Sequence, residues 1–580
     1  MLRSHHLGQI GEGLLGNELT VCGWAERIRA VGGIAFILLR DRYGVLQISM
    51  EGMADQEKIG REYCLKISGV LQLRPQENRT QDQNGNYELI ASRVEVLNKS
   101  LTPPFMIDER EEINEEIRLK YRYLDIRRRS MKDNLLFRHK VVEAVRETLN
   151  SLDFTEIETP MLMKSTPEGA RDFIVPSRVY PGQFFALPQS PQLYKQMLQV
   201  AGMDRYYQLA KCFRDEDNRK DRQLVHTQID LEMSFVEQED VHRVVESFLK
   251  NVFKKTLNIE IETPFPYLPH DECIRLYGLD KPDVRFGMPF FDLNEVFSAS
   301  DYPGFSEVLA QNGRIAGFTI KGGASLSRKD LDGFSEFVKT YRAKGVFSTK
   351  FVGGEFTSGA AKLIPQTQVK NLKVLSGVEE GDLLVFVADK AEVTNAALGW
   401  LRNSVARQLN LIPENQYKFL WVTDFPAFEW NDETRVWDAK HHMFSAPREC
   451  DMEYLKDGQL QKVYAVLYDL VLNGVELGSG SLRIHNASVQ KYIMQKIGLS
   501  DEAIEQRFGF FLKSLEYGAP PHGGIALGLD RLVMTLLQLD NIRDVMAFPN
   551  SSGARYLLDD SPTSVPLETL DELHLEVMPE

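Results

Sequence analysis

The chain has 580 residues, of which 43% are hydrophobic and 26% are charged. Because this length exceeds what one hydrophobic core can serve, we expect about three to five domains. The ordinary composition excludes a fibrous or largely disordered chain. The formal net charge is -15, from 68 Lys and Arg against 83 Asp and Glu. A field of that sign repels polyanions, so nucleic-acid binding has to depend on local basic patches.

Targeting and cysteine signals favour a cytoplasmic protein with no membrane partner. Residues 1–20 contain no apolar core of the kind found in secretory signals, and no apolar run approaches the roughly 20 residues that cross a bilayer. The 5 cysteines are scattered without a C-x-x-C pair. This spacing disfavours both a structural zinc site and a disulfide framework.

Residues 1–103 are predicted to form a β-barrel. Its expected strands are rich in β-forming residues and bounded by Gly, Asn and Asp: 19–24, 34–40, 45–50, 65–73 and 87–97. A series of short strands in about 100 residues indicates an OB-fold, a barrel that binds single-stranded nucleic acid. Arg29, Phe36 and Gln47 are candidate contacts, with Phe36 stacking on a base and Gln47 reading a base edge. The alternative for Phe36, a place in the barrel core, stays open.

Residues 104–130 are predicted to connect the barrel to a second domain. The pair Pro103-Pro104 ends the first module, and an acidic stretch at 108–116 followed by a basic one at 118–129 indicates a charged helical connector. Apolar residues then recur at helical spacing up to Leu149, and 151–160 changes to a β pattern. Strands and helices alternate to about residue 290, so 131–290 is expected to be the first part of a larger domain.

The larger domain is expected to be interrupted by an insertion. Between residues 291 and 416 the pattern changes to short Gly-punctuated strands and amphipathic helices, typical of an α+β unit. Strand signals resume at 417, so 417–555 is predicted to complete the larger domain. Residues 556–580 are expected to lie on the surface as a C-terminal extension. The predicted fold class is therefore α+β and multidomain.

Arg214 is a candidate anion-binding residue. It lies in Cys212-Phe213-Arg214-Asp215-Glu216-Asp217, before a polar loop and a stretch that is predicted to return as a strand. A guanidinium at the base of such a hairpin can hold a phosphate and a carboxylate oxygen together. A surface hairpin with salt bridges is the alternative interpretation of the same residues.

Arg531 is a second candidate, more than half the chain away. The Gly-rich segment 523–531 is predicted to be a strand that leads into an apolar helix, with Arg531 near the helix start, where anions are favoured. Neither a P-loop nor a G-x-G-x-x-G fingerprint accompanies it. A nucleotide site at Arg214 and Arg531 must therefore have another design.

Three segments resemble, in this order, the signature motifs of the class II aminoacyl-tRNA synthetases: Thr159-Pro160, Phe213-Arg214-Asp215-Glu216 and Gly528-Leu529-Asp530-Arg531. Further stretches resemble the bacterial-type aspartyl-tRNA synthetases of subclass IIb: 165–172, 189–196, 277–283 and 441–444. The resemblance covers nearly the whole chain. It implies a catalytic domain built on an antiparallel sheet, a barrel that binds the tRNA anticodon through Arg29, Phe36 and Gln47, and a homodimer whose interface includes Pro160.

The resemblance also implies an aspartate site. Arg483 and Lys195 would hold the side-chain carboxylate, and asparagine would leave these cations unpaired. Glu168, Gln192 and Asp230 would meet the substrate ammonium group. The full expected set for aspartate is Glu168, Gln192, Lys195, Arg214, Asp230, His441, His442 and Arg483. Which of the two histidines contacts aspartate stays open.

For ATP, the resemblance implies that Arg214 bridges the α-phosphate and the substrate carboxylate, and that Arg531 holds the γ-phosphate. Asp469 and Glu476 would bind Mg²⁺ through hard oxygen ligands, and Glu476 joins the two arginines as the expected catalytic set. His226 would stack on adenine. The expected nucleotide contacts are Arg214, Asp215, Glu216, Gln223, His226, Glu476, Gly528, Leu529, Asp530 and Arg531.

The implied reaction joins L-aspartate to tRNA(Asp) with ATP in two steps, through aspartyl-adenylate. No general base is needed, because the substrate carboxylate is already an anion at pH 7. Two alternatives stay open: an enzyme of relaxed specificity that also charges tRNA(Asn), and a non-catalytic RNA-binding relative that keeps the fold. Retention of Arg214, Asp469, Glu476 and Arg531 argues against the second.

Overall fold

The computed structural model describes residues 1–31, 34–51, 59–166 and 169–578. The chain divides into two compact units. The first comprises Met1–His139, Asn218–Gln223 and Asn541–Val565, and the second comprises Lys140–Asp217, Leu224–Asp540 and Pro566–Glu580. None of the helices in the described ranges is long and apolar enough to cross a membrane.

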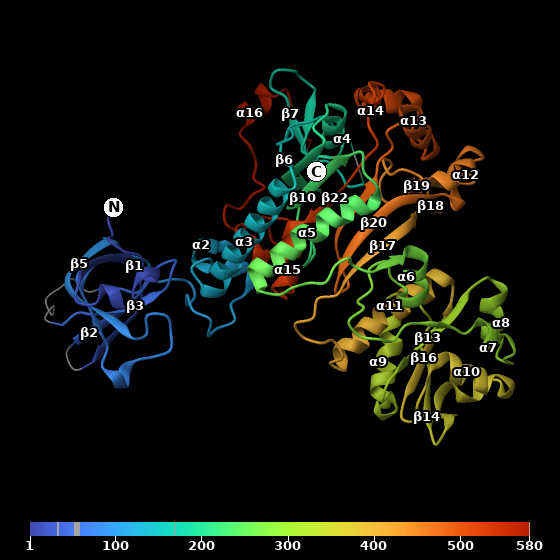
Figure 1. Ribbon diagram of the computed structural model, residues 1–580, viewed down its shortest axis with the longest axis horizontal. Helices are drawn as coiled ribbons and strands as arrows, with labels where there is room; N and C mark the ends of the chain where they lie inside the picture. Colours follow the sequence, from blue (N-terminus) through green and yellow to red (C-terminus); the bar gives the residue numbers. More distant parts are fainter. Residues whose placement is uncertain (32–33, 52–58, 167–168, 579–580) are drawn as a thin grey trace. The chain divides into compact units, whose positions relative to one another are not determined.

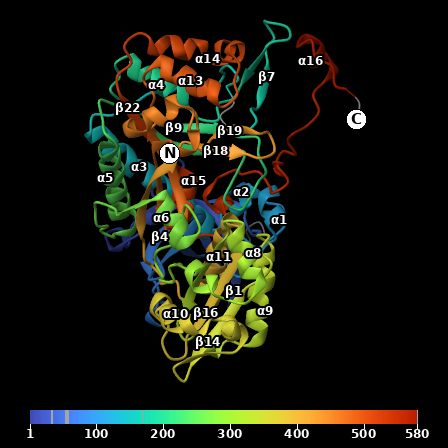
Figure 2. The same ribbon diagram turned by 90° about the vertical axis from the view of Figure 1, so that its right-hand side faces the viewer.

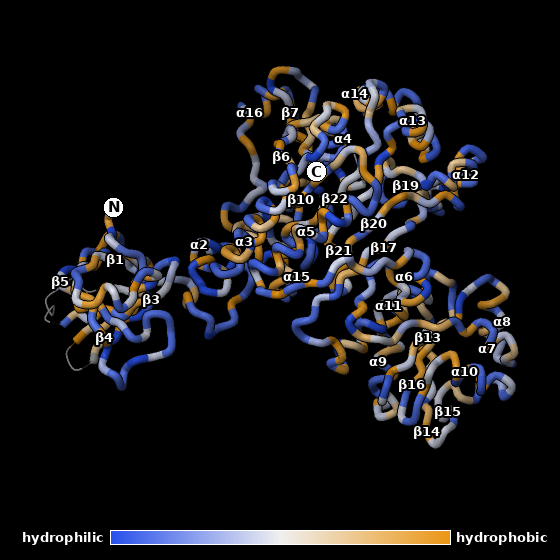
Figure 3. The backbone as a smooth tube through the Cα atoms, viewed as in Figure 1, coloured by the Kyte–Doolittle hydropathy of each residue, from blue (hydrophilic) through white to orange (hydrophobic). Residues whose placement is uncertain are grey.

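The first unit begins with a closed barrel in the order β1-β2-β3-β5-β4, in which only the β3 and β5 pair is parallel. Inward positions such as Ile37 and Leu39 are fully buried and alternate with partly exposed ones. Figure 3 shows hydrophobic and hydrophilic segments interspersed along the barrel. The strands are β1 Glu18–Val31, β2 Ile34–Arg40, β3 Val45–Ser49, β4 Cys64–Leu73 and β5 Tyr87–Asn98. The OB-fold prediction is confirmed.

Strand β1 is longer than the sequence pattern predicted. The expected strand ended at residue 24, where charged residues break the apolar pattern, but β1 continues to Val31 with a register shift between Ala25 and Arg27. An irregularity of this kind re-aims the side chains that follow it. The charged side chains of β1 therefore belong to a strand and not to a loop.

The stretch expected to be a helical connector contains two short helices, α1 Glu115–Lys120 and α2 Arg122–Asp125. Asn114 caps α1 by accepting a hydrogen bond from the Glu116 N–H at 2.8 Å. Arg122 is buried and donates to Asp125 at 2.6 Å and to the carbonyl oxygen of Met546 at 2.8 Å. The connector is thus fixed within the first unit.

The second unit is centred on an eight-stranded sheet, in the order β11-β17-β20-β21-β22-β10-β9-β6 (Figure 1). All neighbours are antiparallel except the pairs at the two edges, β11 with β17 and β6 with β9. The strands are β6 Thr155–Glu156, β9 Arg205–Phe213, β10 Val225–Ser234, β11 Tyr267–Pro269, β17 Phe419–Pro426, β20 Tyr464–Leu472, β21 Val475–Leu482 and β22 His522–Gly528. The predicted antiparallel-sheet domain is confirmed.

Helices cover this sheet, and β10 is accordingly buried along most of its length. Helices α4 and α15 pack against β10, and α5 packs against β22. The helices of this part are α4 Gln192–Val200, α5 Gln238–Leu257, α6 His270–Tyr277, α12 Met452–Lys456, α13 Ala487–Lys496, α14 Asp501–Leu515 and α15 Leu529–Leu536, together with α3 Arg129–Ser151 from Lys140 onward. Two hairpins complete it: β7 Ile174–Pro176 with β8 Phe184–Ala186, and β18 Phe428–Asn431 with β19 Val436–Ala439. Within the β pattern expected at 151–160, Ser151 still belongs to α3, and the strand β6 is limited to Thr155 and Glu156, the two residues that pair with β9.

The insertion between β11 and β17 contains a second sheet, in the order β12-β13-β16-β14-β15. Strand β16 alternates between two cores: Leu383 and Val385 pack with α9 and α11, whereas Leu384 and Phe386 pack with α7, α8 and α10. In Figures 1 and 2, α9 and α10 accordingly lie on opposite sides of β14 and β16. The elements are β12 Phe291–Asp292, α7 Asn294–Ser298, α8 Pro303–Ala310, β13 Arg314–Ile320, α9 Arg328–Lys339, β14 Phe347–Val352, β15 Glu355–Thr357, α10 Val369–Ser376, β16 Leu383–Asp389 and α11 Ala391–Gln408. Near the C-terminus, α16 Leu567–Glu572 has no buried residue.

Candidate active site

Four charged side chains meet inside the sheet domain. Lys195 on α4 places its Nζ 3.1 Å from Asp230 Oδ2 and 3.3 Å from Glu232 Oε2, both on β10. Arg483, directly after β21, donates from Nε and Nη2 to the two oxygens of Glu232 at 2.9 and 3.2 Å. All four residues are at most 2% exposed. Buried charges are tolerated only when they are paired in this way.

The register of the sheet explains why these carboxylates meet the two cations. Asp230 and Glu232 are two residues apart on β10 and therefore share one face. Glu232 pairs with Gly524 on β22. A Cβ atom at Gly524 would lie 2.2 Å from Glu232 Oε2 and 2.1 Å from the Leu231 carbonyl oxygen. Only glycine at this position leaves space for the Glu232 carboxylate.

Burial and neighbouring charges shift the pKa values of Asp230 and Glu232 in opposite directions. Burial raises the pKa of Asp230 to about 6, against the opposing effect of Lys195. Burial also disfavours the Glu232 carboxylate, but Arg483 and Lys195 outweigh it and hold the pKa of Glu232 below its ordinary value. At neutral pH both acids are ionised, so the cluster contains two positive and two negative groups.

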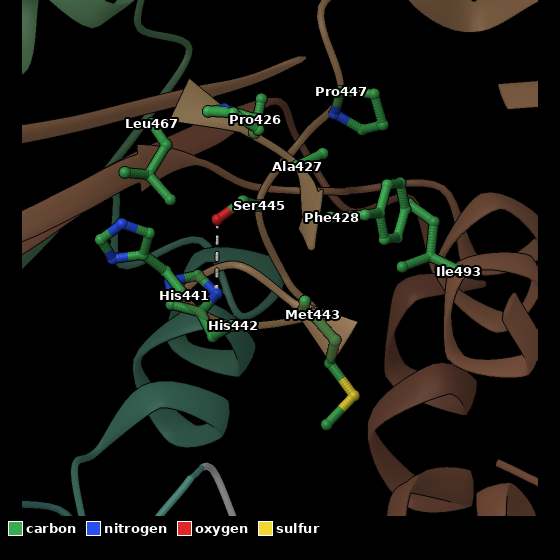
Figure 4. A pocket seen from close by; sticks show the side chains of 12 residues that line it. Pro426, Ala427, Phe428, His441, His442, Met443, Ser445, Pro447, Leu467 and Ile493 are labelled. Atoms are coloured by element: carbon green, nitrogen blue, oxygen red, sulfur yellow. Dashed lines mark hydrogen bonds between the residues drawn. The ribbon is translucent and has the colours of Figure 1, made fainter. Parts of the chain in front are cut away.

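His442 contacts the cluster directly. Its Nε2 lies 3.0 Å from Arg483 Nη1. Because a guanidinium only donates, Nε2 accepts from Arg483. The other ring nitrogen, Nδ1, lies 3.3 Å from the Phe444 N–H and 3.4 Å from Ser445 Oγ (Figure 4). Burial, and then the charge of Arg483, holds the pKa of His442 well below its ordinary value. His442 is therefore a neutral hydrogen-bonding group of this site.

His441 lines the same small pocket as His442 (Figure 4). Its ring meets the Phe425 ring edge-on, with 4.9 Å between centroids. Burial lowers the pKa of His441 to about 4, although Glu476 partly opposes the shift. His441 is thus a neutral ring at pH 7.

A hydrogen bond holds each of Arg214 and Arg531 in place, and each carries a guanidinium suited to an anion. The backbone N–H of Arg214 donates to the Leu224 carbonyl oxygen at 2.9 Å and so closes the hairpin of β9 and β10. Its Nε is buried and, within the described ranges, has no hydrogen-bond partner. Arg531 lies in the first turn of α15, where its Nη1 donates to the Glu476 carbonyl oxygen at 2.8 Å. Donors of this kind are suited to phosphate oxygens.

Asp469 and Glu476 lie on the neighbouring strands β20 and β21. Burial and the nearby Glu476 raise the pKa of Asp469 well above its ordinary value, and its Oδ1 is buried without a hydrogen-bond partner among the residues described. A divalent cation would supply the missing partner and relieve the repulsion between the two acids. No group of three or more His, Cys, Asp or Glu residues in the described part of the chain could hold a metal. Substrate phosphates and water would therefore have to complete the coordination.

Comparison with known proteins identifies the family. The family described as "tRNA synthetases class II (D, K and N)" matches residues 114–552, and "OB-fold nucleic acid binding domain" matches residues 19–97. The chain belongs to the class II aminoacyl-tRNA synthetases. It is 46% identical to the "Aspartate--tRNA(Asp/Asn) ligase" of Caldanaerobacter subterraneus, over 99% of this chain and 98% of that protein. It is 45% identical to the "Aspartate--tRNA ligase" of Macrococcus caseolyticus, with the same coverage.

Solved structures of this class have the same fold. The asparaginyl-tRNA synthetase from Pyrococcus horikoshii complexed with asparaginyl-adenylate matches with a TM-score of 0.59 at 18% identity, over 95% of this chain and 98% of that one. An aspartyl-tRNA synthetase from Entamoeba histolytica matches with a TM-score of 0.54 at 18% identity, over 93% and 89% of the two chains. These likenesses concern the fold alone.

In this class II synthetase, the structure brings together four residues of the expected aspartate set: Lys195, Asp230, His442 and Arg483. Gln192 lies one turn before Lys195 on α4, and its Nε2 is buried without a hydrogen-bond partner in the described part of the chain. Glu168 lies outside the described residues.

The expected nucleotide residues have different environments. The Asp215 N–H donates to the Arg171 carbonyl oxygen at 3.2 Å, and Glu216 continues the same loop. His226 pairs with Cys212 across β9 and β10. Gly528 and Leu529 form the junction of β22 and α15.

Two of the expected nucleotide contacts have other partners in the structure. Asp530 Oδ2 accepts a hydrogen bond from the Thr227 N–H at 2.7 Å, which fixes α15 to β10. Gln223 belongs to the first unit, where its Oε1 accepts from the Asn550 N–H at 3.0 Å. Whether either side chain also contacts nucleotide stays a prediction.

Sequence reasoning missed Glu232, which holds both cations of the site. The signal was present as Asp230-Leu231-Glu232, in which two acids at a spacing of two share one face of a strand. Attention to that spacing would have predicted a paired acid.

The barrel residues Arg29, Phe36 and Gln47 lie on one outer face. Arg29 pairs with Phe36 across β1 and β2, and Leu38, two residues after Phe36, pairs with Gln47. Phe36 is partly exposed, while its neighbour Ile37 is fully buried in the core. Phe36 is therefore not a core residue. Gln47 Nε2 donates to Glu88 Oε2 at 2.9 Å.

Proposed function

We propose that this synthetase activates L-aspartate with ATP and transfers it to tRNA(Asp). The observation that carries the proposal is the buried pair of cations, Lys195 and Arg483, held by Glu232 at a spacing suited to one carboxylate. Full-length relatives at 45% and 46% identity are named aspartate ligases of tRNA, which supports the same substrate.

Selection of aspartate follows from the charge of the pocket. The substrate side-chain carboxylate binds Lys195 and Arg483, while its ammonium group is met by Asp230 and Gln192. Asparagine presents a neutral amide to the same cations and leaves them incompletely paired. Unpaired buried donors cost about 1 to 3 kcal/mol each, so the polar site itself discriminates between the two substrates.

Adenylate formation needs alignment and charge stabilisation. An oxygen of the substrate α-carboxylate attacks the α-phosphorus of ATP, the bond from that phosphorus to the bridging oxygen breaks, and pyrophosphate leaves with the electron pair. Arg214 binds the α-phosphate and the carboxylate, and Arg531 binds the γ-phosphate. Asp469 and Glu476 would hold Mg²⁺, which neutralises phosphate charge when bound.

Transfer completes the reaction. A hydroxyl oxygen of the 3'-terminal ribose attacks the aspartyl carbonyl carbon, and AMP leaves. The barrel binds the anticodon through the outer face that carries Arg29, Phe36 and Gln47, with Phe36 as a stacking platform.

The protein acts as a homodimer in this proposal. Strand β6 is the edge strand of the large sheet, and the exposed Pro160 follows it closely. Met161 and Leu162, next in the chain, are 40% and 49% exposed. An open sheet edge with exposed apolar residues favours pairing with another chain. Light scattering at micromolar concentration tests this, and a stable monomer contradicts it.

A second candidate is relaxed specificity toward tRNA(Asn). The observation that favours it is the name of several relatives, "Aspartate--tRNA(Asp/Asn) ligase". Charging purified tRNA(Asn) with aspartate distinguishes the two, and the absence of product above background leaves tRNA(Asp) as the single substrate.

The experiment that tests the main proposal is aspartate-dependent exchange between ATP and pyrophosphate. Exchange with aspartate but not with asparagine or lysine is expected. No exchange with any amino acid would instead favour a non-catalytic RNA-binding protein.

A further inference from the structure

Residues 280–288 link helix α6 to the inserted domain and approach the carboxylates proposed to bind Mg²⁺. A Cβ atom at Gly474, in the turn between β20 and β21, would lie 2.9 Å from Asp283 Cβ, so the segment is in contact with the hairpin that carries Asp469 and Glu476. The position of this segment therefore affects what those carboxylates meet.

Lys281 is the residue of this segment that reaches the carboxylates. Its Nζ lies 3.4 Å from Glu476 Oε2 and 3.1 Å from Asp280 Oδ1. The Lys281 side chain is 35% exposed. An ammonium group thus lies beside Glu476.

The inserted domain holds this segment through Arg402 on α11. Arg402 is 1% exposed and donates to the carbonyl oxygens of Asp283 and Phe286, each at 2.8 Å, and of Gly287 at 2.8 Å. Its guanidinium also lies over the Phe286 ring, 4.2 Å from the centroid. Several bonds from one rigid, planar group fix the path of the segment more firmly than any single contact.

We propose that Lys281 is a further residue of the nucleotide site, which shares Glu476 with the divalent cation and binds the pyrophosphate portion of ATP, and that Arg402 is the residue that positions it. Arg531, assigned to the γ-phosphate, bonds the carbonyl oxygen of Glu476, and Lys281 contacts the carboxylate of that same residue. The ammonium group therefore lies at the pyrophosphate end of the site. The inserted domain has a role in catalysis through this contact.

This inference rests on the proposed function and has a distinctive consequence for metal binding. Because the Lys281 ammonium competes for Glu476, its removal leaves two uncompensated acids that attract a divalent cation more strongly. The same removal takes a charged donor from the leaving pyrophosphate. Metal affinity and ATP use should consequently change in opposite directions, whereas a merely structural defect would weaken both.

The test uses Lys281→Met in the full-length protein, with Lys321→Met as the control. Lys321 is an ion-paired lysine of the inserted domain, 3.0 Å from Glu379 and 59% exposed. For Lys281→Met we expect Mn²⁺ binding without nucleotide, measured by the paramagnetic signal of the free ion, to be about threefold tighter or more. We expect kcat/KM for ATP in the exchange assay to fall by about tenfold or more, with KM for aspartate unchanged. The control should match the wild type.

Arg402→Lys and Arg402→Met test the positioning role. Both should lower kcat/KM for ATP while KM for aspartate stays constant, and combining either with Lys281→Met should add little. A melting temperature close to that of the wild type for Arg402→Lys separates this effect from unfolding. If the wild type catalyses exchange but Lys281→Met has the ATP kinetics and the Mn²⁺ affinity of the wild type, the inference is overturned. If the wild type itself does not catalyse exchange, the proposed function is refuted.

Discussion

Arg483 and Glu232 form a bidentate pair in which both side chains are buried, with N to O distances of 2.9 and 3.2 Å. The same carboxylate lies 3.3 Å from Lys195. One acid that the sequence motifs did not single out thus holds both cations of the cluster.

Glu232→Gln should destabilise the sheet domain. The change removes the anion that balances Lys195 and Arg483, and breaking a buried pair costs about 3 to 5 kcal/mol. For a domain of this size we expect the melting temperature to fall by about 6 °C or more, measured by calorimetry. The control, Glu147→Gln, breaks the exposed pair with Lys255 and should cost less than about 1 kcal/mol. Equal effects of the two changes would contradict a special role for Glu232.

Arg483→Lys should weaken aspartate binding specifically. Lysine keeps the charge but cannot bond both oxygens of a carboxylate in a plane. The expected result is an increase of about tenfold or more in KM for aspartate in the exchange assay, with KM for ATP within about twofold of the wild type. A parallel loss for both substrates would indicate that Arg483 supports the fold and does not select aspartate.

The affinity for aspartate should depend on pH through Asp230. Because its pKa lies at about 6, the carboxylate is ionised above that pH and is progressively protonated below it, where it can no longer balance the substrate ammonium group. His441, with a pKa of about 4, stays neutral across this window. KM for aspartate in the exchange assay should therefore rise as the pH falls from 7 to 5, while KM for ATP changes less. A flat profile for aspartate would show that Asp230 does not meet the ammonium group.

Local pattern was enough to predict the barrel, because alternation and turn residues determine strands directly, whereas the antiparallel sheet of the large domain was predicted through resemblance. It failed where charge interrupts alternation: Arg27 and Arg29 lie within β1, yet charged residues in a strand resemble a loop in sequence. Strand β6 is only two residues long because its pairing with β9 is limited to Thr155 and Glu156. In each case pairing with a neighbour in space decided the structure.

The residues of the site were likewise predictable only in part. Arg483 and Lys195 were predicted as a cation pair through resemblance, but 288 positions separate them and no local pattern joins them. Their common partner Glu232 depends on the space that Gly524 leaves on the next strand. The contacts of Lys281 and Arg402 arise from the packing of an inserted domain, which periodicity in the sequence does not reveal.

Phe36→Ala should separate the two steps of the reaction. Phe36 is partly exposed on the outer face of the barrel, beside Arg29, and lies far along the chain from the residues proposed to bind aspartate and ATP. Loss of one stacking platform costs about 1 to 3 kcal/mol per base, so KM for tRNA(Asp) in the charging assay should rise by about fivefold or more. Aspartate-dependent exchange, which needs no tRNA, should stay unchanged. Phe36→Trp keeps a stacking surface and should restore charging. If Phe36→Ala charges tRNA(Asp) as well as the wild type, the anticodon does not bind through this face.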